Sequence, residues 1–299
     1  MKHFTFKDFQ QKFPDDATCL EWLFIRMYPN GVDCKKCLKV TKHYRAESRP
    51  SYCCANCGNH VHPTADTILH KSSTSLTTWF YAMYLMASTR CGISAKQIQR
   101  ETAVSYKTAW RMFHQIRKMM DEGGSLGGLT VATVEMAETY IGAPLRNKHR
   151  NKLKQGTHKD KQPIFGMVER GGRVITKVTP DAKTTTIFPI VSEYVLPAST
   201  VYTDCYTTYD HLGKLPQGYN HQRINHSMGV YVMGDVHTNT IEGFWSLLKR
   251  GIGGVYHSVS SKHLQSYCNE YSFRYNHRRD QQPMFISLLN RIEKSEKVA

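Results

Sequence analysis

The chain has 299 residues, of which 40% are hydrophobic and 21% charged. This composition excludes an intrinsically disordered chain, and the length suffices for about two domains with cores of their own. Lysine and arginine number 40 against 24 acidic residues, which gives a net charge of +16. Such an excess indicates a polyanionic partner, most commonly a nucleic acid.

The sequence carries no pattern of a targeting or membrane segment. Met1–Lys7 lacks the apolar stretch and the cleavage site of a secretory signal, and the most apolar run, 79–87, is too short to span a bilayer. Nine cysteines, four of them at metal-binding spacing, indicate a reducing compartment. We therefore expect a cytoplasmic protein with no membrane partner.

Residues 1–30 predict an N-terminal helical segment. Asp15 or Asp16, which follow Pro14, are placed to cap a second helix within it. Apolar residues recur there at three- and four-residue steps. They are Phe9, Phe13, Cys19, Leu20, Leu23 and Met27.

Residues 31–62 predict a zinc ribbon. Cys34 and Cys37 form one C-x2-C pair, Cys54 and Cys57 form a second, and sixteen residues lie between the pairs. This is the spacing of a structural zinc site with four thiolate ligands. The alternatives are unrelated thiols or a disulfide pair. Cys53 adjoins the second pair, and His60 is a weaker substitute ligand.

Residues 63–125 predict a helical DNA-binding domain that contains a helix-turn-helix. The first of its two helices covers 94–101 and the second follows a cap at Ser105. We expect Ile98, Val104, Ala109, Trp110, Phe113 and Ile116 to form the shared core. Tyr106, Lys107, Arg111, Gln115 and Lys118 then face outward to meet DNA. The alternative is an ordinary helical hairpin with a solvated basic face.

The remaining chain predicts a mixed α/β domain over 129–290. Its elements alternate between the two-residue period of strands and the 3.6-residue period of helices. They are a strand at 129–143, a hairpin at 164–178 that turns at Gly171 and Gly172, a helix at 184–194, strands at 200–204 and 222–227, and helices at 237–250 and 260–275.

The helix at 237–250 carries an acid and a base on one flank. Ile241, Phe244, Trp245 and Leu248 have the spacing of a buried stripe. Glu242, Ser246 and Lys249 share the neighbouring flank because they lie about one helical turn apart. Asp204 ends the strand at 200–204, and two such acids can share divalent metals and cut a phosphodiester. The alternative is that Asn239 and Glu242 form a capping box.

A basic arm follows the first strand of this domain. Residues 146–159 contain no acid and six lysines or arginines, Arg146, Lys148, Arg150 and Lys152 among them. A flexible cationic segment of this kind suits neutralisation of DNA phosphates. A solvated loop is the alternative interpretation.

Together these features resemble the zinc-ribbon DDE transposases of bacterial insertion sequences, the ISXO-like group related to the Merlin transposons. The resemblance covers nearly the whole chain. It rests on the four-cysteine ribbon and on the motifs Ser105–Trp110, Val134–Gly142, Tyr202–Asp204, His237–Arg250, Tyr256–His257, Lys262–Leu264 and Phe273–Arg279.

The resemblance implies an RNase H-like catalytic core and a metal triad that binds two Mg²⁺ ions. Asp204 matches its second acid and Glu242 its third, with Asn239 one turn earlier as an assisting residue. Lys249 matches the basic residue that holds DNA in the family, and Arg250 follows it. Expected partners are the transposon ends and target DNA, both double-stranded, bound by a homodimer or higher oligomer in the bacterial nucleoid.

The departure from the family pattern is Ala137, which stands where the family has its first Asp. A methyl group cannot bind a cation, so we expect a catalytically inactive variant. Glu135 shares the face of Ala137 but is displaced along the strand by about 6.6 Å, too far to replace the missing ligand.

Two other functions remain open at this point. A non-enzymatic, domesticated DNA-binding regulator would use only the ribbon and the helix-turn-helix. The retained Asp204, Glu242 and Lys249 weigh against it, because a pure DNA binder has no use for them. A structure-specific nuclease would share the catalytic core but has no need of two DNA-reading modules.

Overall fold

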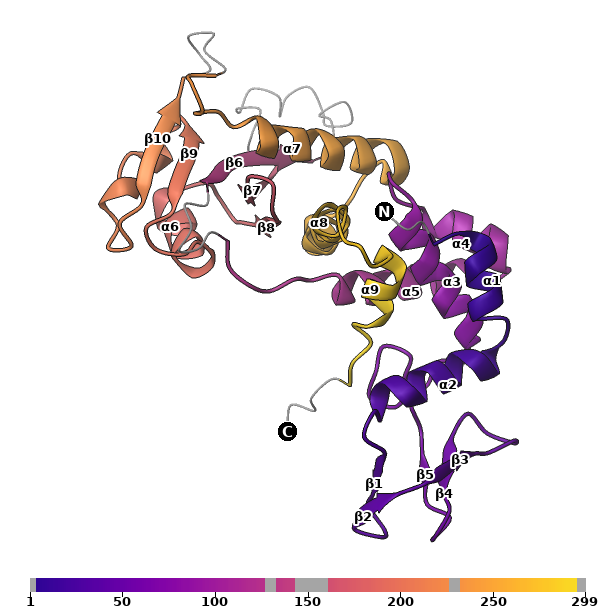
Figure 1. Cartoon of the computed structure of the whole chain (residues 1–299). Helices are drawn as coiled ribbons and strands as arrows, with labels where there is room; N and C mark the ends of the chain where they lie inside the picture. Colours follow the sequence, from indigo (N-terminus) through magenta and orange to yellow (C-terminus); the bar gives the residue numbers. More distant parts are fainter. Residues whose placement is uncertain (1–3, 127–132, 143–160, 226–231, 295–299) are drawn as a thin grey trace. The chain divides into compact units, whose positions relative to one another are not determined.

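The structure of the chain is a computed structural model that describes residues 4–126, 133–142, 161–225 and 232–294 (Figure 1). The chain divides into two compact units. The first comprises Met1–Met119 with Asp280–Ala299, and the second comprises Met120–Arg279. None of the helices within the described ranges is long and apolar enough to cross a membrane.

The first unit is mainly helical outside its ribbon. Thr5 begins the first helix with a capping box to Asp8, and the Asp15 carboxylate accepts the backbone N–H of Thr18 at the start of the second. These caps confirm the two helices predicted within residues 1–30. The helices of the unit are α1 (Phe6–Lys12), α2 (Asp16–Met27), α3 (Leu76–Ser88), α4 (Ala95–Thr102), α5 (Tyr106–Met119) and α9 (Met284–Leu289).

Aromatic side chains hold these helices together. The Phe13 ring centroid lies 5.0 Å from that of Phe80 on α3 and 5.9 Å from that of Phe285 on α9. Edge-to-face packing at such distances adds about 0.5–1.5 kcal/mol per pair beyond area burial. Helix α9, which the sequence analysis did not predict, therefore joins the core of the N-terminal helices.

The ribbon consists of five short strands in two antiparallel sheets. Each strand has only two or three residues, so a core of apolar side chains cannot stabilise it alone. The strands are β1 (Val32–Cys34) paired with β2 (Lys39–Thr41), and β4 (Tyr52–Cys54) paired with both β3 (His43–Arg45) and β5 (His60–Val61).

Helices α4 and α5 form the predicted helix pair. Ser94 and Ser105 accept backbone N–H groups at their starts, and Ala103 turns the chain in a left-handed conformation. One core prediction was wrong: Trp110 is 41% exposed and stacks on His114, with ring centroids 5.3 Å apart. The buried stripe of α5 runs through Ala109, Met112, Phe113 and Ile116, which leaves Trp110 about 100° away.

The second unit is built on a five-stranded mixed sheet in the order β10-β9-β6-β7-β8. β6 pairs antiparallel with β7 and parallel with β9, and β9 pairs parallel with β10. The strands are β6 (Thr133–Ile141), β7 (Gln162–Glu169), β8 (Val174–Val178), β9 (Thr200–Asp204) and β10 (Asn220–Ile224). β10 begins at Asn220, two residues before the predicted start at 222. Its residues are mostly polar, so the alternation of apolar and polar side chains does not mark where the strand begins.

Helices cover both faces of this sheet (Figure 1). On one face Val134, Met136 and Phe165 pack against α6 (Thr184–Tyr194). On the other face Ala137 and Ile164 belong to a cluster with α7 (Asn239–Gly251) and α8 (Ser261–Asn276). α7 continues into a π-helical turn, η6 (Ile252–Tyr256). Alternate side chains of β6 therefore face α6 on one side of the sheet, and α7 and α8 on the other.

Close packing places α7 directly on the sheet. Gly166 of β7 lies opposite Ala137, and a Cβ atom at Gly166 would overlap the ring of Trp245. The predicted apolar stripe of α7 is confirmed, because Ile241, Phe244, Trp245 and Leu248 are each at most 5% exposed. The opposite flank of α7 is therefore free to carry polar side chains.

Candidate metal centres and nucleic-acid interface

The four predicted zinc ligands lie together in the ribbon. The sulfur atoms of Cys34, Cys37, Cys54 and Cys57 are all within 4.8 Å of one another. Cys34 Sγ lies 3.5 Å from Cys57 Sγ, and Cys37 Sγ lies 3.8 Å from Cys54 Sγ. A tetrahedron of thiolates about 2.3 Å from a zinc ion has sulfur–sulfur edges of about 3.8 Å. The cluster can therefore hold a zinc ion.

The two cysteine pairs are built alike. Leu38 follows the first pair and Gly58 the second, and both have a positive φ, 54° and 71°. The Leu38 N–H donates to the Cys34 carbonyl at 2.8 Å, and the Gly58 N–H donates to the Cys54 carbonyl at 3.0 Å. Each pair is thus held in the same tight turn, which points both sulfurs of a pair toward one centre.

The two ambiguous ligands point elsewhere. Cys53 Sγ approaches the carbonyl oxygen of Cys54 at 3.8 Å and is not part of the sulfur cluster. His60 Nδ1 is hydrogen-bonded to the hydroxyl of the buried Ser51 at 2.9 Å. Neither residue competes with the four cysteines in this structure.

At two of the four cysteines, Cys34 and Cys54, the surroundings favour the thiolate that a metal requires. The Thr41 hydroxyl, together with the backbone N–H groups of Asn56 and Cys57, lowers the pKa of the Cys54 thiol to about 5. The backbone N–H of Cys37 lowers the pKa of Cys34. The Cys37 thiol has a pKa raised to about 12 by its neighbouring thiols, foremost Cys57, in the absence of a positive ion. A cation at the centre would reverse that effect.

In the second unit, Ala137 and Asp204 occupy neighbouring strands on the face that α7 covers. The β6–β9 register pairs Thr133 with Thr200 and Glu135 with Tyr202. If this register is extended by two residues, Ala137 aligns with Asp204. Side chains two residues apart on a strand point to the same face, so Ala137 and Asp204 lie on the same face as Glu135 and Tyr202. Ala137 packs in the cluster that includes Ile241 and Trp245 of α7.

The N-terminus of α7 is anchored by Glu135, a role that the sequence analysis missed. The Glu135 carboxylate is fully buried and accepts the backbone N–H groups of Thr240 at 2.7 Å and Ile241 at 3.1 Å. It also accepts the Thr240 hydroxyl at 2.8 Å. An acidic side chain in an apolar strand must find such partners, and that requirement was a signal in the sequence.

Arg170 completes this anchor. Its Nε donates to Glu135 Oε1 at 2.7 Å, and its other nitrogens donate to the carbonyl oxygens of Asp235 at 2.7 Å and His237 at 3.0 Å. Its guanidinium lies over the Tyr202 ring, 4.7 Å from the centroid. The segment before α7 and the start of α7 are thereby tied to β6 and β9, two residues before the Ala137 and Asp204 positions.

The polar flank of α7 carries the remaining predicted residues. Asn239, Glu242, Lys249 and Arg250 are all exposed. The Thr238 hydroxyl donates to Glu242 Oε1 at 2.8 Å, and helix α7 takes Thr238, not Asn239, as its N-cap. The alternative capping box between Asn239 and Glu242 is therefore not formed.

Within the described parts of the chain, the cysteine cluster is the one group of three or more Cys, His, Asp or Glu side chains placed to hold a metal together. Asp204 and Glu242 belong to no such group. The residue aligned with Asp204 contributes only a methyl group, because it is Ala137. Within its described residues, the second unit therefore shows no group of three such ligands.

The half-buried Glu138 lies on the face of β6 opposite to that of Ala137. Tyr209 donates its hydroxyl to Glu138 Oε2 at 2.5 Å. Burial, and then the charge of Asp204, raise the pKa of Glu138. This bond ties the segment that follows Asp204 to β6.

The predicted DNA-facing residues of α5 line its exposed side. Tyr106, Lys107, Arg111 and Lys118 are exposed, and Gln115 is half-buried. Arg111 Nη2 donates to Ser72 Oγ at 3.3 Å, and its guanidinium lies 5.8 Å from the Trp79 ring centroid. The basic arm, with Arg146, Lys148, Arg150 and Lys152, lies outside the described residues.

Residues 126–276, about half of the chain, match the family model of the ISXO2-like transposase domain. The chain belongs to the ISXO2-like transposase family. The matched transposase domain includes β6 to β10, α7 and all of α8. It therefore contains the positions of Ala137, Asp204 and Glu242.

Two individual proteins of similar sequence agree with this assignment. An uncharacterised protein in transposable element ISH50 of Halobacterium salinarum is 30% identical over 261 residues, which is 82% of this chain and 85% of that protein. An uncharacterised transposase-like protein of Haemophilus influenzae is 34% identical over 104 residues, 35% of this chain and 81% of that protein.

Among solved structures, a chain of the simian T-cell lymphotropic virus intasome in complex with PP2A regulatory subunit B56 gamma aligns with 68% of this chain and 76% of its own length. The TM-score is 0.31 and the sequence identity 12%, so this match carries no argument about the fold.

Proposed function

We propose that this transposase is a DDE enzyme of an insertion sequence whose catalytic centre lacks one carboxylate. The proposal is carried by the parallel β6–β9 register, which pairs Glu135 with Tyr202 and so places Ala137 and Asp204 two residues further along the same face; Ala137 packs against α7. An acid at position 137, Asp204 and Glu242 come from two adjacent strands and one helix. Catalytic acids of a metal-dependent phosphodiester cleavage need this kind of convergence.

The strand order supports an RNase H-like catalytic core. Counting from β6, the sheet runs 5-4-1-2-3, with the second strand antiparallel to its neighbours and the first, fourth and fifth parallel. The first and fourth strands carry Ala137 and Asp204. We infer that the domain proposed for 129–290 works as this core, with the proposed segments 1–30, 31–62 and 63–125 ahead of it.

The chemistry expected of a complete centre is in-line attack on phosphodiesters, for which two Mg²⁺ ions supply charge and a nucleophilic oxygen. The residues present do not fit that pair of ions, since the methyl of Ala137 offers no ligand. We infer that Asp204 and Glu242 can bind one divalent ion weakly, and that Asn239 assists beside them. The unaltered chain should then bind DNA without cutting it.

DNA binding is assigned to cations and aromatic residues outside this centre. We propose that Tyr106, Lys107 and Arg111 of α5 read the transposon end, and that Lys249 and Arg250 hold DNA beside the acids. We propose that the arm with Arg146, Lys148, Arg150 and Lys152 neutralises phosphates. A zinc ion on the four cysteines would stabilise the ribbon. The working form would be a homodimer or higher oligomer on two transposon ends and target DNA.

The test of this proposal uses the unaltered chain. Its affinity is measured for a duplex carrying the outermost base pairs of its own element and for a duplex with the same bases scrambled. We expect tighter binding of the end duplex and no cleavage with Mg²⁺ or Mn²⁺. Equal affinity for the two duplexes, at all salt concentrations, would contradict the transposase proposal.

A further inference from the structure

We propose that a cavity between the zinc ribbon and the helical part of the first unit binds backbone phosphates of the transposon-end DNA. The inference rests on the proposed function and adds a contact surface to it. The cavity has a volume of about 710 Å³. One wall is the loop between β3 and β4, residues 46–51, and the other is the connector 62–75 that leads into α3.

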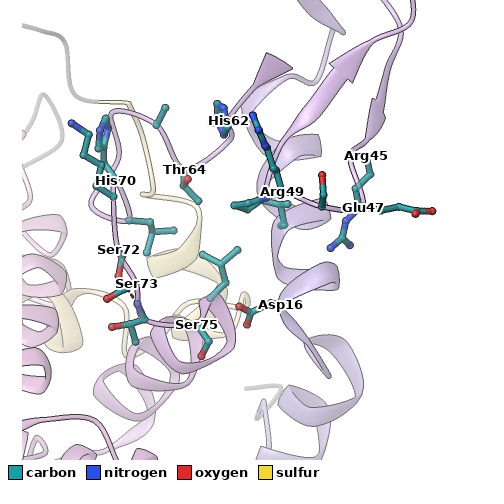
Figure 2. A pocket seen from close by; sticks show the side chains of 18 residues that line it. Asp16, Arg45, Glu47, Arg49, His62, Thr64, His70, Ser72, Ser73 and Ser75 are labelled. Atoms are coloured by element: carbon teal, nitrogen blue, oxygen red, sulfur yellow. Dashed lines mark hydrogen bonds between the residues drawn. The ribbon is translucent and has the colours of Figure 1, made fainter. Parts of the chain in front are cut away.

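The cavity is lined by more positive than negative charge. Arg45 and Arg49 come from the ribbon side, Lys71 from the connector, and His62 and His70 add two imidazoles. Figure 2 shows the Arg49 side chain beside His62 at one rim of the cavity. The guanidinium of Arg49 and the imidazole of His62 can both donate hydrogen bonds to an anion.

The two acids of the cavity balance only part of this charge. The Asp16 carboxylate accepts the Thr77 N–H at 2.9 Å and the Thr77 hydroxyl at 2.7 Å, so it caps the start of α3. Figure 2 shows the Glu47 carboxylate pointing away from the connector. Within the described part of the chain, Arg45, Arg49 and Lys71 make no ion pair.

His70 presents a donor to the same space. The backbone N–H of Asp66 donates to His70 Nδ1 at 2.7 Å, so this nitrogen is an acceptor. The proton of the neutral ring is then on Nε2, where it is available for an anion. The serine and threonine hydroxyls of the connector add further donors of the kind that contact phosphate.

The connector also joins the cavity to the proposed reading helix. Ser72 lines the cavity, and its hydroxyl oxygen accepts Trp79 Nε1 at 2.9 Å and Arg111 Nη2 at 3.3 Å. One short segment therefore shapes the cationic cavity and holds Arg111 of α5. A DNA backbone bound in the cavity would fix the position of α5 along the same duplex, which a free phosphate ion could not do.

The experiment compares two triple variants of the full chain. The cavity variant is Arg45→Ala/Arg49→Ala/Lys71→Ala. The control variant, Lys7→Ala/Lys12→Ala/Lys39→Ala, removes the same charge from exposed positions of the same unit outside the cavity. Zinc content and circular dichroism must match the parent for both variants, and Arg49→Lys, which keeps the charge, serves as a conservative variant if the triple variant does not fold.

The measured quantity is the slope of log affinity against log salt concentration, with the end duplex and with the scrambled duplex. Removal of one phosphate contact lowers the magnitude of the slope by about 0.9. We expect the slope of the cavity variant, which loses three cations, to fall in magnitude by about 2.7 on both duplexes, and that of the control variant by much less. If the triple variant does not fold, the two single variants at Arg49 are compared: Arg49→Lys should keep the parent's slope, whereas the slope of Arg49→Ala should fall in magnitude by about 1. Equal slopes for the cavity and control variants, or for the two Arg49 variants, would overturn the inference.

A second arm distinguishes DNA from free phosphate. Isothermal titration of the parent with inorganic phosphate in the millimolar range should show no saturable binding. Saturable binding that is abolished in the cavity variant, with an unchanged salt slope, would assign the cavity to a free phosphate instead. Failure of the proposed function looks different, because the parent would then bind end and scrambled duplexes equally while the salt slopes still test the cavity.

Discussion

The ribbon and the acid centre are two candidate metal sites of one chain, and they differ in how they are assembled. The ribbon brings its four sulfurs from two short turns within residues 34–57, and all four lie within 4.8 Å of one another. The acid centre draws Ala137, Asp204 and Glu242 from two strands and a helix spread over more than a hundred residues. The first site has four cysteines at the spacing of a zinc site, and the second, as we propose it, lacks one carboxylate.

This difference shows which interactions hold the ligands of each site in place. In the ribbon, backbone turns at Leu38 and Gly58 orient the four cysteines, and a bound metal would supply much of the folding energy. In the transposase domain, apolar packing and the Glu135 anchor hold the sheet and α7 together. Loss of a ligand should therefore unfold the ribbon but leave the acid centre intact and inactive.

The largest effect is expected at the ribbon. Cys34→Ser or Cys57→Ser removes one of four thiolates from a site whose metal contributes on the order of 10 kcal/mol to folding. Bound zinc, measured by mass spectrometry of protein purified without chelators, should fall from about one ion per chain to nearly none, and protease should cut within 31–62. Cys53→Ser is the matched control and should keep its zinc. A zinc-free parent protein would end this account of the ribbon.

The Glu135 anchor gives the next effect. Glu135→Ala leaves Arg170 without its carboxylate and two α7 amides without an acceptor, at a cost of about 3 kcal/mol. Hydrogen exchange should speed up at Thr240 and Ile241, with a lower melting temperature for the transposase domain. Glu193→Ala, on the exposed side of α6, should change neither. Unchanged protection of these amides would show that α7 does not depend on Glu135.

A smaller and more selective effect separates reading from neutralisation of DNA. Arg111→Ala should narrow the gap in affinity between end and scrambled DNA, by about 1–3 kcal/mol if the arginine contacts a base edge. Replacing Arg146, Lys148, Arg150 and Lys152 together by alanine should weaken binding to both duplexes about equally and flatten the salt dependence. The reverse pattern would mean that the two roles are exchanged.

The smallest effect concerns pH. Burial, with a contribution from Arg223, lowers the pKa of His221 to about 4 from an ordinary value near 6.5. Because the unfolded chain then binds a proton more readily than the folded one, stability is lost as pH falls from about 6.5 to 4. His221→Gln, which keeps a partner for the Thr203 hydroxyl at β9, should lose less melting temperature over this range than the parent. Parallel melting curves would contradict the effect.

Local patterns in the sequence predicted much of the ribbon and several elements of the transposase domain. The cysteine spacing led to the sulfur cluster, and the 3.6-residue period led to the buried stripe of α7. Helix α6 and strand β9 have the predicted bounds, 184–194 and 200–204, since turn residues and β-branched runs delimit them. Interactions between neighbours in the chain decide such features, so a single sequence contains them.

Features that depend on distant residues were missed. The Glu135 anchor joins residues 105 positions apart, and only the folded sheet brings them together. Trp110 was predicted to lie in the shared core, although its position on α5 places it on the exposed side, stacked on His114. Helix α9 was not predicted because its six residues show little periodicity, and its Phe285 packs on an aromatic core made far earlier in the chain.

The central claim is that one missing carboxylate separates this chain from an active transposase. The direct measurement is strand cleavage and joining of the end duplex with Mg²⁺ by the Ala137→Asp variant, beside the same variant with Asp204→Ala or Glu242→Ala added. The account predicts activity for Ala137→Asp alone and none for the parent or either double variant. An Ala137→Asp protein that binds its ends tightly yet stays inert with Mg²⁺ and Mn²⁺ would contradict it and favour a DNA-binding regulator.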